Sequence, residues 1–586
     1  MLSILTANII KKEDVFMNTL VIVLIAVVVL GLGYVLYGRR IAKKWGIDPK
    51  AETPAVKYND GKDYVPTNGW TVFSHQFSSI AGAGPVTGAI QAAVFGWLPV
   101  LLWILIGGVF FGAVTDFGAL YASVKNQGKS MGMLIEKYIG KLGRKLFLLF
   151  CWLFSLLIIA VFADMVSGTF TAFDAVSGAK LATASTNGSA GMVSIMFMLF
   201  AVVFGLIQKK FNFSGWKEFV LGVVFIVVSF AIGMKVPIIL GKDGWSYVVF
   251  AYIFIAAIMP IWLMKQPRDY MTTIMFVCMI VGAALGLIIG HPTMNLPVFT
   301  GFKNEQLGTM FPILFVTVAC GAVSGFHSLV SSGTSSKTIA NEKDMLKVGY
   351  GAMILESVLA VLALCVAGAA AKNGIPAEGT PFQIFSRGVA GFFEKMGLSV
   401  HFSTVFMTMC VSALALTTLD AVARIGRMSF QELFSVDDMK NAKPWRKLLC
   451  NTYFSTIFTL ACGFVLTKIG YQTIWPLFGS ANQLLSALVL ITLCVFLKVT
   501  GRSNKMLFPP MIIMLCVTFT ALIQRVVGLV KSLVAGQEIF ASVIQLVVAV
   551  LLITLALIIA VNSFKSYVRS KKGSEVEETE KTIVNE

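Results

Sequence analysis

Charged residues, clustered cysteines and recognised catalytic motifs are scarce in this sequence. Only 13% of its 586 residues are charged, whereas 57% are hydrophobic, which excludes an ordinary soluble globule and indicates an integral membrane protein. The nine cysteines are scattered without a Cys-x-x-Cys pair, which disfavours a metal site or a disulfide framework. His-Glu-x-x-His, nucleophile-elbow and Walker-type motifs are absent, which disfavours an intramembrane enzyme and an ATP-driven pump. We therefore expect no enzyme activity, no cofactor and no resident metal.

Long apolar runs dominate what is present. A helix needs about 20 apolar residues to cross a bilayer, and the runs have this length. They predict an all-α polytopic membrane protein with about fifteen spans. The fifteen runs lie at 19–37, 70–92, 97–124, 146–166, 189–207, 216–234, 245–264, 270–290, 309–332, 348–370, 400–421, 450–468, 473–497, 507–530 and 539–561.

The positive charge of the chain follows the predicted topology. Of the 47 Lys and Arg residues, 35 fall in the loops after the odd-numbered spans and 12 in the other segments. Basic loops stay cytoplasmic, so we expect the N-terminus outside, the acidic tail inside, and insertion in the plasma membrane. The net charge of +18 is explained in this way and does not indicate nucleic acid. The first basic cluster has no cleavage site before it, so run 19–37 is expected to be an anchor, and either Met1 or Met17 is the start.

The second run contains a break. Glycine and proline in GAGP at residues 82–85 end one helix and begin another, since Pro85 suits a first helical position. The N–H groups of Val86, Thr87 and Gly88 would then be free to bind an anion, and broken helices mark substrate sites in transporters. The alternative is a proline-kinked helix packed through small residues. The residues expected to bind substrate here are His75, Gln76, Ser79, Gly82, Gly84, Pro85, Val86 and Thr87.

Ionisable residues inside the spans form a second candidate site, because such residues are costly in lipid and mark ion pathways. Four of them (His75, Asp116, His327 and Glu356) are predicted at similar depth and could share one cavity; the alternative is simple pairing within the bundle. Ser324, Ser328 and Ser331 recur near His327 at helical spacing, which suits a sodium site, a water path or close helix packing. The complete set of candidate coupling residues is Asp116, Asp164, Ser324, His327, Ser328, Ser331, Glu356 and Asp420.

Pro260 makes the seventh run the best second candidate for a broken helix, and a substrate-site residue. Breaks in spans 2 and 7, which run in opposite directions, match an inverted five-helix repeat over spans 2–6 and 7–11. Span 1 would then be peripheral, and spans 12–15 would be appended after the repeat.

Four segments resemble the carbon starvation A (CstA) transporter family. They are SHQFSSIAGAGP at 74–85, DF at 116–117, PRDY at 267–270 and TTLD at 417–420. The resemblance implies a transporter region over 17–395 and a five-helix region over 400–561. The remaining residues, 562–586, are expected to form a short polar cytoplasmic tail. It also implies a LeuT-type fold and uptake of peptides or pyruvate, driven by protons, during nutrient starvation.

We therefore expect a symporter that imports small carboxylated nutrients with H⁺. The alternatives are a sodium-coupled carboxylate or amino-acid symporter and, with less support, a channel or a membrane sensor. A sensor needs a sizeable signalling domain, and no loop is long enough to form one. Besides substrate and ion, the expected partner is membrane lipid, and the sequence does not determine an oligomeric state.

Overall fold

The structure is a computed structural model that describes residues 18–61, 64–174, 177–211, 215–260, 263–305, 307–436 and 441–574. The choice between Met1 and Met17 as the start, and the acidic tail from residue 575, lie outside these residues.

Nearly all described secondary structure is helical, because an apolar segment in lipid must satisfy its backbone N–H and C=O groups internally. The small exception is a hairpin of β1 (Lys303–Asn304) and β2 (Gly308–Thr309), which pairs Lys303 with Thr309. Helices outside the predicted apolar runs are α3 (Arg39–Trp45), α4 (Pro54–Lys57), α9 (Met131–Ile139), α18 (Pro381–Lys395) and α20 (Pro444–Leu449). Helices within the apolar runs include α2 (Thr19–Leu32), α7 (Trp97–Gly107), α8 (Ala113–Lys125), α10 (Lys141–Phe170), α11 (Ala184–Phe211), α12 (Trp216–Lys235), α13 (Lys242–Ile258), α14 (Lys265–Gly290), α17 (Ala352–Ala370), α19 (Val400–Phe434), α21 (Thr452–Thr467), α22 (Tyr471–Val499), α23 (Phe508–Val534) and α24 (Ile539–Arg569).

All fifteen predicted runs are helical in whole or in part, but they are not equally long. Among the described residues, 11 helices are long and apolar enough to cross a membrane. The helices α13 and α21 have only 17 and 16 residues, and two further runs are each split into two short helices. The chain is therefore a multi-pass helical membrane protein, and the number of fifteen crossings stays a prediction.

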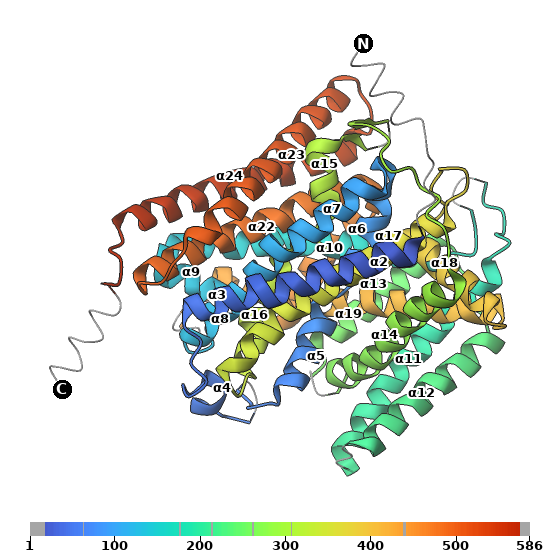
Figure 1. Ribbon diagram of the computed structural model, residues 1–586, viewed down its shortest axis with the longest axis horizontal. Helices are drawn as coiled ribbons and strands as arrows, with labels where there is room; N and C mark the ends of the chain where they lie inside the picture. The colour runs from blue at the N-terminus through green and yellow to red at the C-terminus, as the bar shows by residue number, and fades with distance from the viewer. Residues whose placement is uncertain are drawn as a thin grey trace.

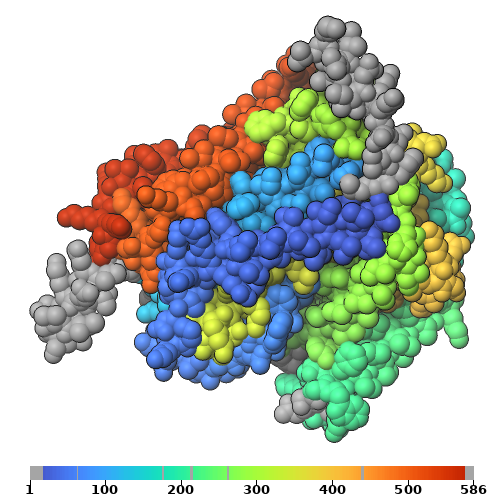
Figure 2. All heavy atoms as spheres, in the orientation of Figure 1, coloured from blue at the N-terminus to red at the C-terminus, as the bar shows by residue number. Residues whose placement is uncertain are grey.

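Three helices form the centre of the bundle. The most apolar stretch is 100% buried in α22 and 83% buried in α10 and α19, against 22% for the segment that begins with α2 and 28% for α12. Figure 1 shows α23 and α24 along one edge and α11 with α12 along the opposite edge, and in Figure 2 the dark-blue N-terminal segment crosses the visible face. The first span is peripheral, as predicted. That the last four spans are appended to a repeat stays a prediction; one of them, α22, packs against α8, α10 and α16 at the core.

Two of the predicted runs are discontinuous. The first divides into α5 (Gly69–Ile80) and α6 (Gly84–Ala92) at the expected GAGP segment. The second divides into α15 (Met310–Thr317) and α16 (Gly325–Gly333). Both breaks lie inside the bundle, where protein groups can satisfy the freed backbone.

Pro260 does not interrupt a span, so the prediction of a break in the seventh run is wrong. The helix α13 ends at Ile258, Met259 is extended, and α14 begins at Lys265. Proline follows the end of this helix because it cannot continue the hydrogen-bond ladder. With the second break in the ninth run instead, the five-helix repeat loses the break position on which it rested.

Candidate functional site

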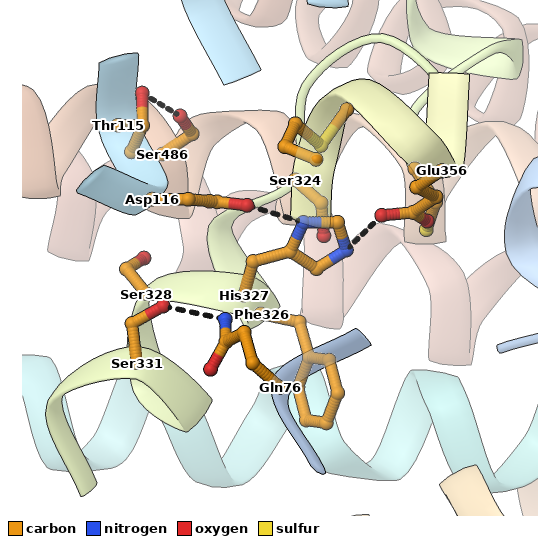
Figure 3. A network of polar contacts seen from close by, with 12 residues as sticks. Gln76, Thr115, Asp116, Ser324, Phe326, His327, Ser328, Ser331, Glu356 and Ser486 are labelled. Carbon is orange, nitrogen blue, oxygen red and sulfur yellow. Dashed lines mark hydrogen bonds and ion pairs between the residues drawn. The ribbon is translucent and has the colours of Figure 1, made fainter. Parts of the chain in front are cut away.

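A histidine with a carboxyl group at each ring nitrogen lies at the second break (Figure 3). His327 Nδ1 is 2.9 Å from Asp116 Oδ2, and His327 Nε2 is 3.3 Å from Glu356 Oε2. All three residues have no solvent-exposed surface. They come from the first turn of α16, from α8 and from α17, so the cluster depends on three separate helices.

The two acids are not equivalent. Asp116 Oδ2 shares a hydrogen bond with His327, whereas Glu356 has only the longer contact of 3.3 Å to His327 Nε2. Both Glu356 oxygens, and Oδ1 of Asp116, are buried without a hydrogen bond to the described residues. Burying an ionised carboxylate without partners is very costly. The geometry therefore favours an ionised Asp116 beside His327 and a protonated Glu356.

Polar side chains hold α16 in place from two directions. Asn482 Oδ1, from α22, accepts hydrogen bonds from the Ser324 hydroxyl and the Phe326 N–H, both 3.1 Å long. In α5, the Gln76 amide donates to Ser331 Oγ at 2.8 Å and accepts from Ser335 Oγ at 2.6 Å. The predicted residues Gln76, Ser324 and Ser331 are thus brought together around His327, and they form one network with groups from α5 and α22.

The carbonyl end of α15 is satisfied by side chains with N–H donors. Trp475 Nε1 donates to Thr317 O at 3.2 Å, and Gln483 Nε2 donates to Phe315 O at 2.6 Å. Trp103 Nε1 donates to the same Phe315 carbonyl at 3.2 Å. These donors replace the helical hydrogen bonds lost at the break, which explains why the core helix α22 carries the amide of Gln483.

A small cavity of about 20 Å³ lies between the two breaks. Gly82 and Gly84 line it from the first break, and Cys320, His327 and Asn482 line it from the second. The phenylalanines Phe154, Phe162, Phe326 and Phe478 enclose it. One water needs about 10–15 Å³ by the same measure, so the cavity has the size of a single water molecule.

Close backbone packing explains the glycines of the first break. A Cβ on Gly84 would lie 2.4 Å from Cys320 Sγ, and one on Gly82 would lie 2.5 Å from Thr418 Oγ1. One detail of the prediction is wrong: the Thr87 N–H donates to Ala83 O at 3.0 Å and is not free. The turn that could receive an anion therefore begins at Gly84 and includes Val86, with Pro85 between them.

Three other predicted residues lie away from the His327 cluster, whereas Ser328 directly follows His327 in α16 (Figure 3). His75 is exposed on α5, so it does not share the cavity with the other three, and Ser79 is half-buried on the same helix. Asp164 binds Lys242 Nζ at 2.7 Å and accepts from the Tyr471 N–H at 2.9 Å. Ser328 donates to the carbonyl of Gly325 within its own turn.

Asp420 belongs to a second buried charged cluster. It contacts Arg424 at 3.1 Å and Arg268 at 3.8 Å. Arg268 also donates to Thr417 Oγ1 at 2.9 Å, and Arg424 to Met259 O at 2.9 Å. These contacts tie the end of α13, the start of α14 and α19 together near Pro260, which gives Asp420 a structural partner.

Sequence reasoning missed Asn482 and Gln483, which satisfy both ends of the second break. Their signal was two adjacent amides in an otherwise apolar run, 473–497. It also missed the break itself, because residues 318–324 contain one glycine and no proline. Here the helix can be interrupted because donors and acceptors from other helices replace its backbone hydrogen bonds.

A multi-pass helical bundle with two discontinuous helices and buried ionisable groups at the break defines the class of membrane transporters. The family is shown by the sequence. The family model for carbon starvation protein CstA matches residues 18–375 and 369–521, so the chain belongs to this family.

The alignments with curated relatives cover most of both chains. The "Peptide transporter CstA" of Escherichia coli is 31% identical over 82% of this chain and 77% of the relative. The "Pyruvate/proton symporter BtsT" of Escherichia coli is 31% identical over 86% and 81%. The "Peptide transporter CstA" of Bacillus subtilis is 28% identical over 95% and 98%. A solved manganese transporter of Eremococcus coleocola is 12% identical, covers 87% of this chain and 99% of its own, and has a TM-score of 0.44.

Proposed function

We propose that this protein is a proton-coupled importer of small carboxylated nutrients, peptides or pyruvate, used during carbon starvation. The substrate carboxylate binds at the first break, near Gly84 and Val86, and the proton is carried by Asp116, His327 and Glu356. The names of the relatives, peptide transporters and a pyruvate/proton symporter, support this substrate class. The Lys and Arg distribution supports an N-terminus outside the plasma membrane.

One observation carries the coupling proposal: His327 has a carboxyl group at each ring nitrogen and also lines the cavity between the breaks. With His327 protonated, Asp116 ionised and Glu356 protonated, the cluster is neutral. Loss of one proton leaves a net charge of −1 beside the cavity. An anionic substrate is then repelled, so the proton and the substrate favour each other's binding, as symport requires.

Access to this cavity requires movement, because a water-sized space does not hold pyruvate or a peptide. The enclosing phenylalanines and the short helices α5, α6, α15 and α16 are the elements that can shift around the breaks. Rocking of such half-helices around a fixed site is the general mechanism of alternating access.

Sodium coupling through the serines has less support. A sodium site needs several oxygens that are free to coordinate the ion. The hydroxyls of Ser324 and Ser328 donate to protein oxygens, and Ser331 accepts from Gln76. The buried acids, in contrast, have oxygens without partners in the described chain.

Uptake by purified protein in proteoliposomes tests the proposal. We expect labelled pyruvate or a labelled dipeptide to accumulate when the outside is acidic, and replacement of sodium by choline to have no effect. Uptake that survives a protonophore but stops in choline would contradict proton coupling.

Matched variants separate coupling from folding. Asp116→Asn should abolish accumulation driven by the pH gradient. Asp243→Asn is the control, because Asp243 is 80% exposed at the start of α13, and it should transport like the wild type.

A further inference from the structure

A second and much larger cavity opens where α6, α15, α22 and α23 meet. Its volume is about 780 Å³, within the range of about 300–1,000 Å³ found for small-molecule sites. In Figure 1, α15 lies beside α23, and the two helices are in contact. We call this cavity the vestibule. Its polar lining consists mainly of Gln91, Gln472, Thr473, Ser480, Gln524 and Arg525.

Among the described residues that line the vestibule, Arg525 is the one ionisable residue. Its Nη2 donates to Thr473 O at 2.8 Å and to the side-chain oxygen of Gln545 in α24. Its Nε is buried without a hydrogen-bond partner, and the described residues offer it no ion pair. Glu538, just before α24, is near enough to interact with Arg525 electrostatically but forms no ion pair with it. An arginine inside a span that forms no ion pair is costly and indicates function.

Gln91 adds a neutral donor to the same cavity. It lies on α6, the helix that follows the first break, and its Nε2 is buried without a partner in the described structure. Guanidinium and amide N–H groups together match a carboxylate, and arginine can bind one through two parallel hydrogen bonds. Because the described lining residues include Arg525 and no acid, the vestibule favours anions.

The vestibule and the cavity at the breaks share α6. Gly84 lines the small cavity and Gln91 lines the vestibule, and residues seven apart lie two turns along the same helix face. In α22, Ser480 lines the vestibule from the face opposite to that of Phe478 and Asn482, which line the small cavity. The Lys and Arg distribution places this end of the molecule outside.

We propose that the vestibule is a receiving site for organic carboxylates, where Arg525 binds the carboxylate before it enters the cavity between the breaks. The path rests on the proposed function, whereas binding in the vestibule does not. The ligand class is a carboxylate on a small molecule, and pyruvate and the C-terminus of a dipeptide are its two probes.

Calorimetry on the purified full-length protein tests binding without transport. We expect Arg525→Gln to weaken binding of pyruvate and of a dipeptide by at least about tenfold. A dipeptide amide, which lacks the carboxylate, should bind the wild type and this variant equally. The control is Arg387→Gln at the same end of the molecule, since Arg387 bonds to Glu378 O at 2.9 Å and does not line the vestibule.

Two substitutions of Gly528 provide a second test that leaves the charge of the vestibule unchanged. Gly528 lines the vestibule, and a Cβ there meets no atom within 4 Å. Gly528→Ala should therefore transport normally, whereas Gly528→Trp should fill the vestibule and raise the KM for uptake by about tenfold. These two Gly528 variants test the vestibule proposal if Arg525→Gln does not fold.

The outcomes separate the two proposals. If Arg525→Gln binds carboxylates as Arg387→Gln does, or if both Gly528 variants have the same KM, the vestibule proposal is overturned and proton-driven uptake still stands. If the wild type binds carboxylates through Arg525 but never accumulates them, the proposed function is overturned and the vestibule site stands.

Discussion

Glu356→Gln is the sharpest perturbation of the His327 cluster. Glutamine has the shape of a protonated glutamate but cannot lose the proton. Glu356 is fully buried and its oxygens lack hydrogen-bond partners among the described residues, so the amide replaces a group that the geometry already favours in its neutral form. We expect the variant to fold with nearly wild-type stability and to behave as a carrier that is permanently protonated at position 356.

The size of the effect follows from the charge beside the cavity. Two unit charges ~6 Å apart at an effective dielectric of ~20 repel by about 3 kcal/mol. This energy corresponds to about 100-fold in substrate affinity. In the wild type, raising the pH removes the proton, the cluster becomes negative, and affinity for an anion falls. One linked proton allows a fall of up to about tenfold per pH unit, and in Glu356→Gln this dependence should disappear.

Two proteoliposome assays measure the consequence. The first follows accumulation of labelled substrate under an imposed pH gradient, which we expect to be lost. The second follows exchange of labelled against unlabelled substrate at equal pH, which needs no net proton movement and should persist. The apparent affinity in the exchange assay should be independent of pH for the variant.

Either of two results would refute this reasoning. Accumulation by Glu356→Gln at the wild-type level would show that Glu356 does not carry the proton. Loss of exchange together with accumulation in a folded variant would show that Glu356 acts in substrate binding or in the conformational change instead.

Three further predictions concern packing, pairing and topology. Gly84→Ala should reduce transport strongly, because its Cβ would lie 2.4 Å from Cys320 Sγ. The control Gly391→Ala, whose Cβ meets open space, should transport normally. Equal uptake by the two variants would contradict close contact of the breaks. Asp164→Asn should lower stability by about 1–3 kcal/mol through lost buried polar contacts without changing the pH dependence of uptake; thermal unfolding and uptake assays check both, and an altered pH profile would give Asp164 a coupling role. A cysteine at Asp60 should react with impermeant reagents only in inverted vesicles, and labelling in intact cells would overturn the predicted topology.

Part of the site could be read from residue type alone. Ionisable residues within apolar runs identified Asp116, His327 and Glu356 because lipid penalises charge wherever it occurs along the chain. The structure brings these three together, whereas His75, which was predicted at the same depth, is exposed. Depth does not determine which face of a helix points into the bundle. Packing against neighbouring helices sets the rotation of each helix about its own axis.

The sequence by itself determined the class of protein, the helical character of fifteen segments and the first break. Hydropathy and the glycine–proline pair act locally, so neighbouring residues suffice to predict their effect. The tertiary structure decided the second break, the central place of α22 and the meeting of His327 with two acids. Each depends on contacts between different helices, and some of these join residues more than a hundred positions apart, such as Asn482 with Ser324 and His327 with Asp116. Such pairings are set by how helices pack, which no local pattern contains.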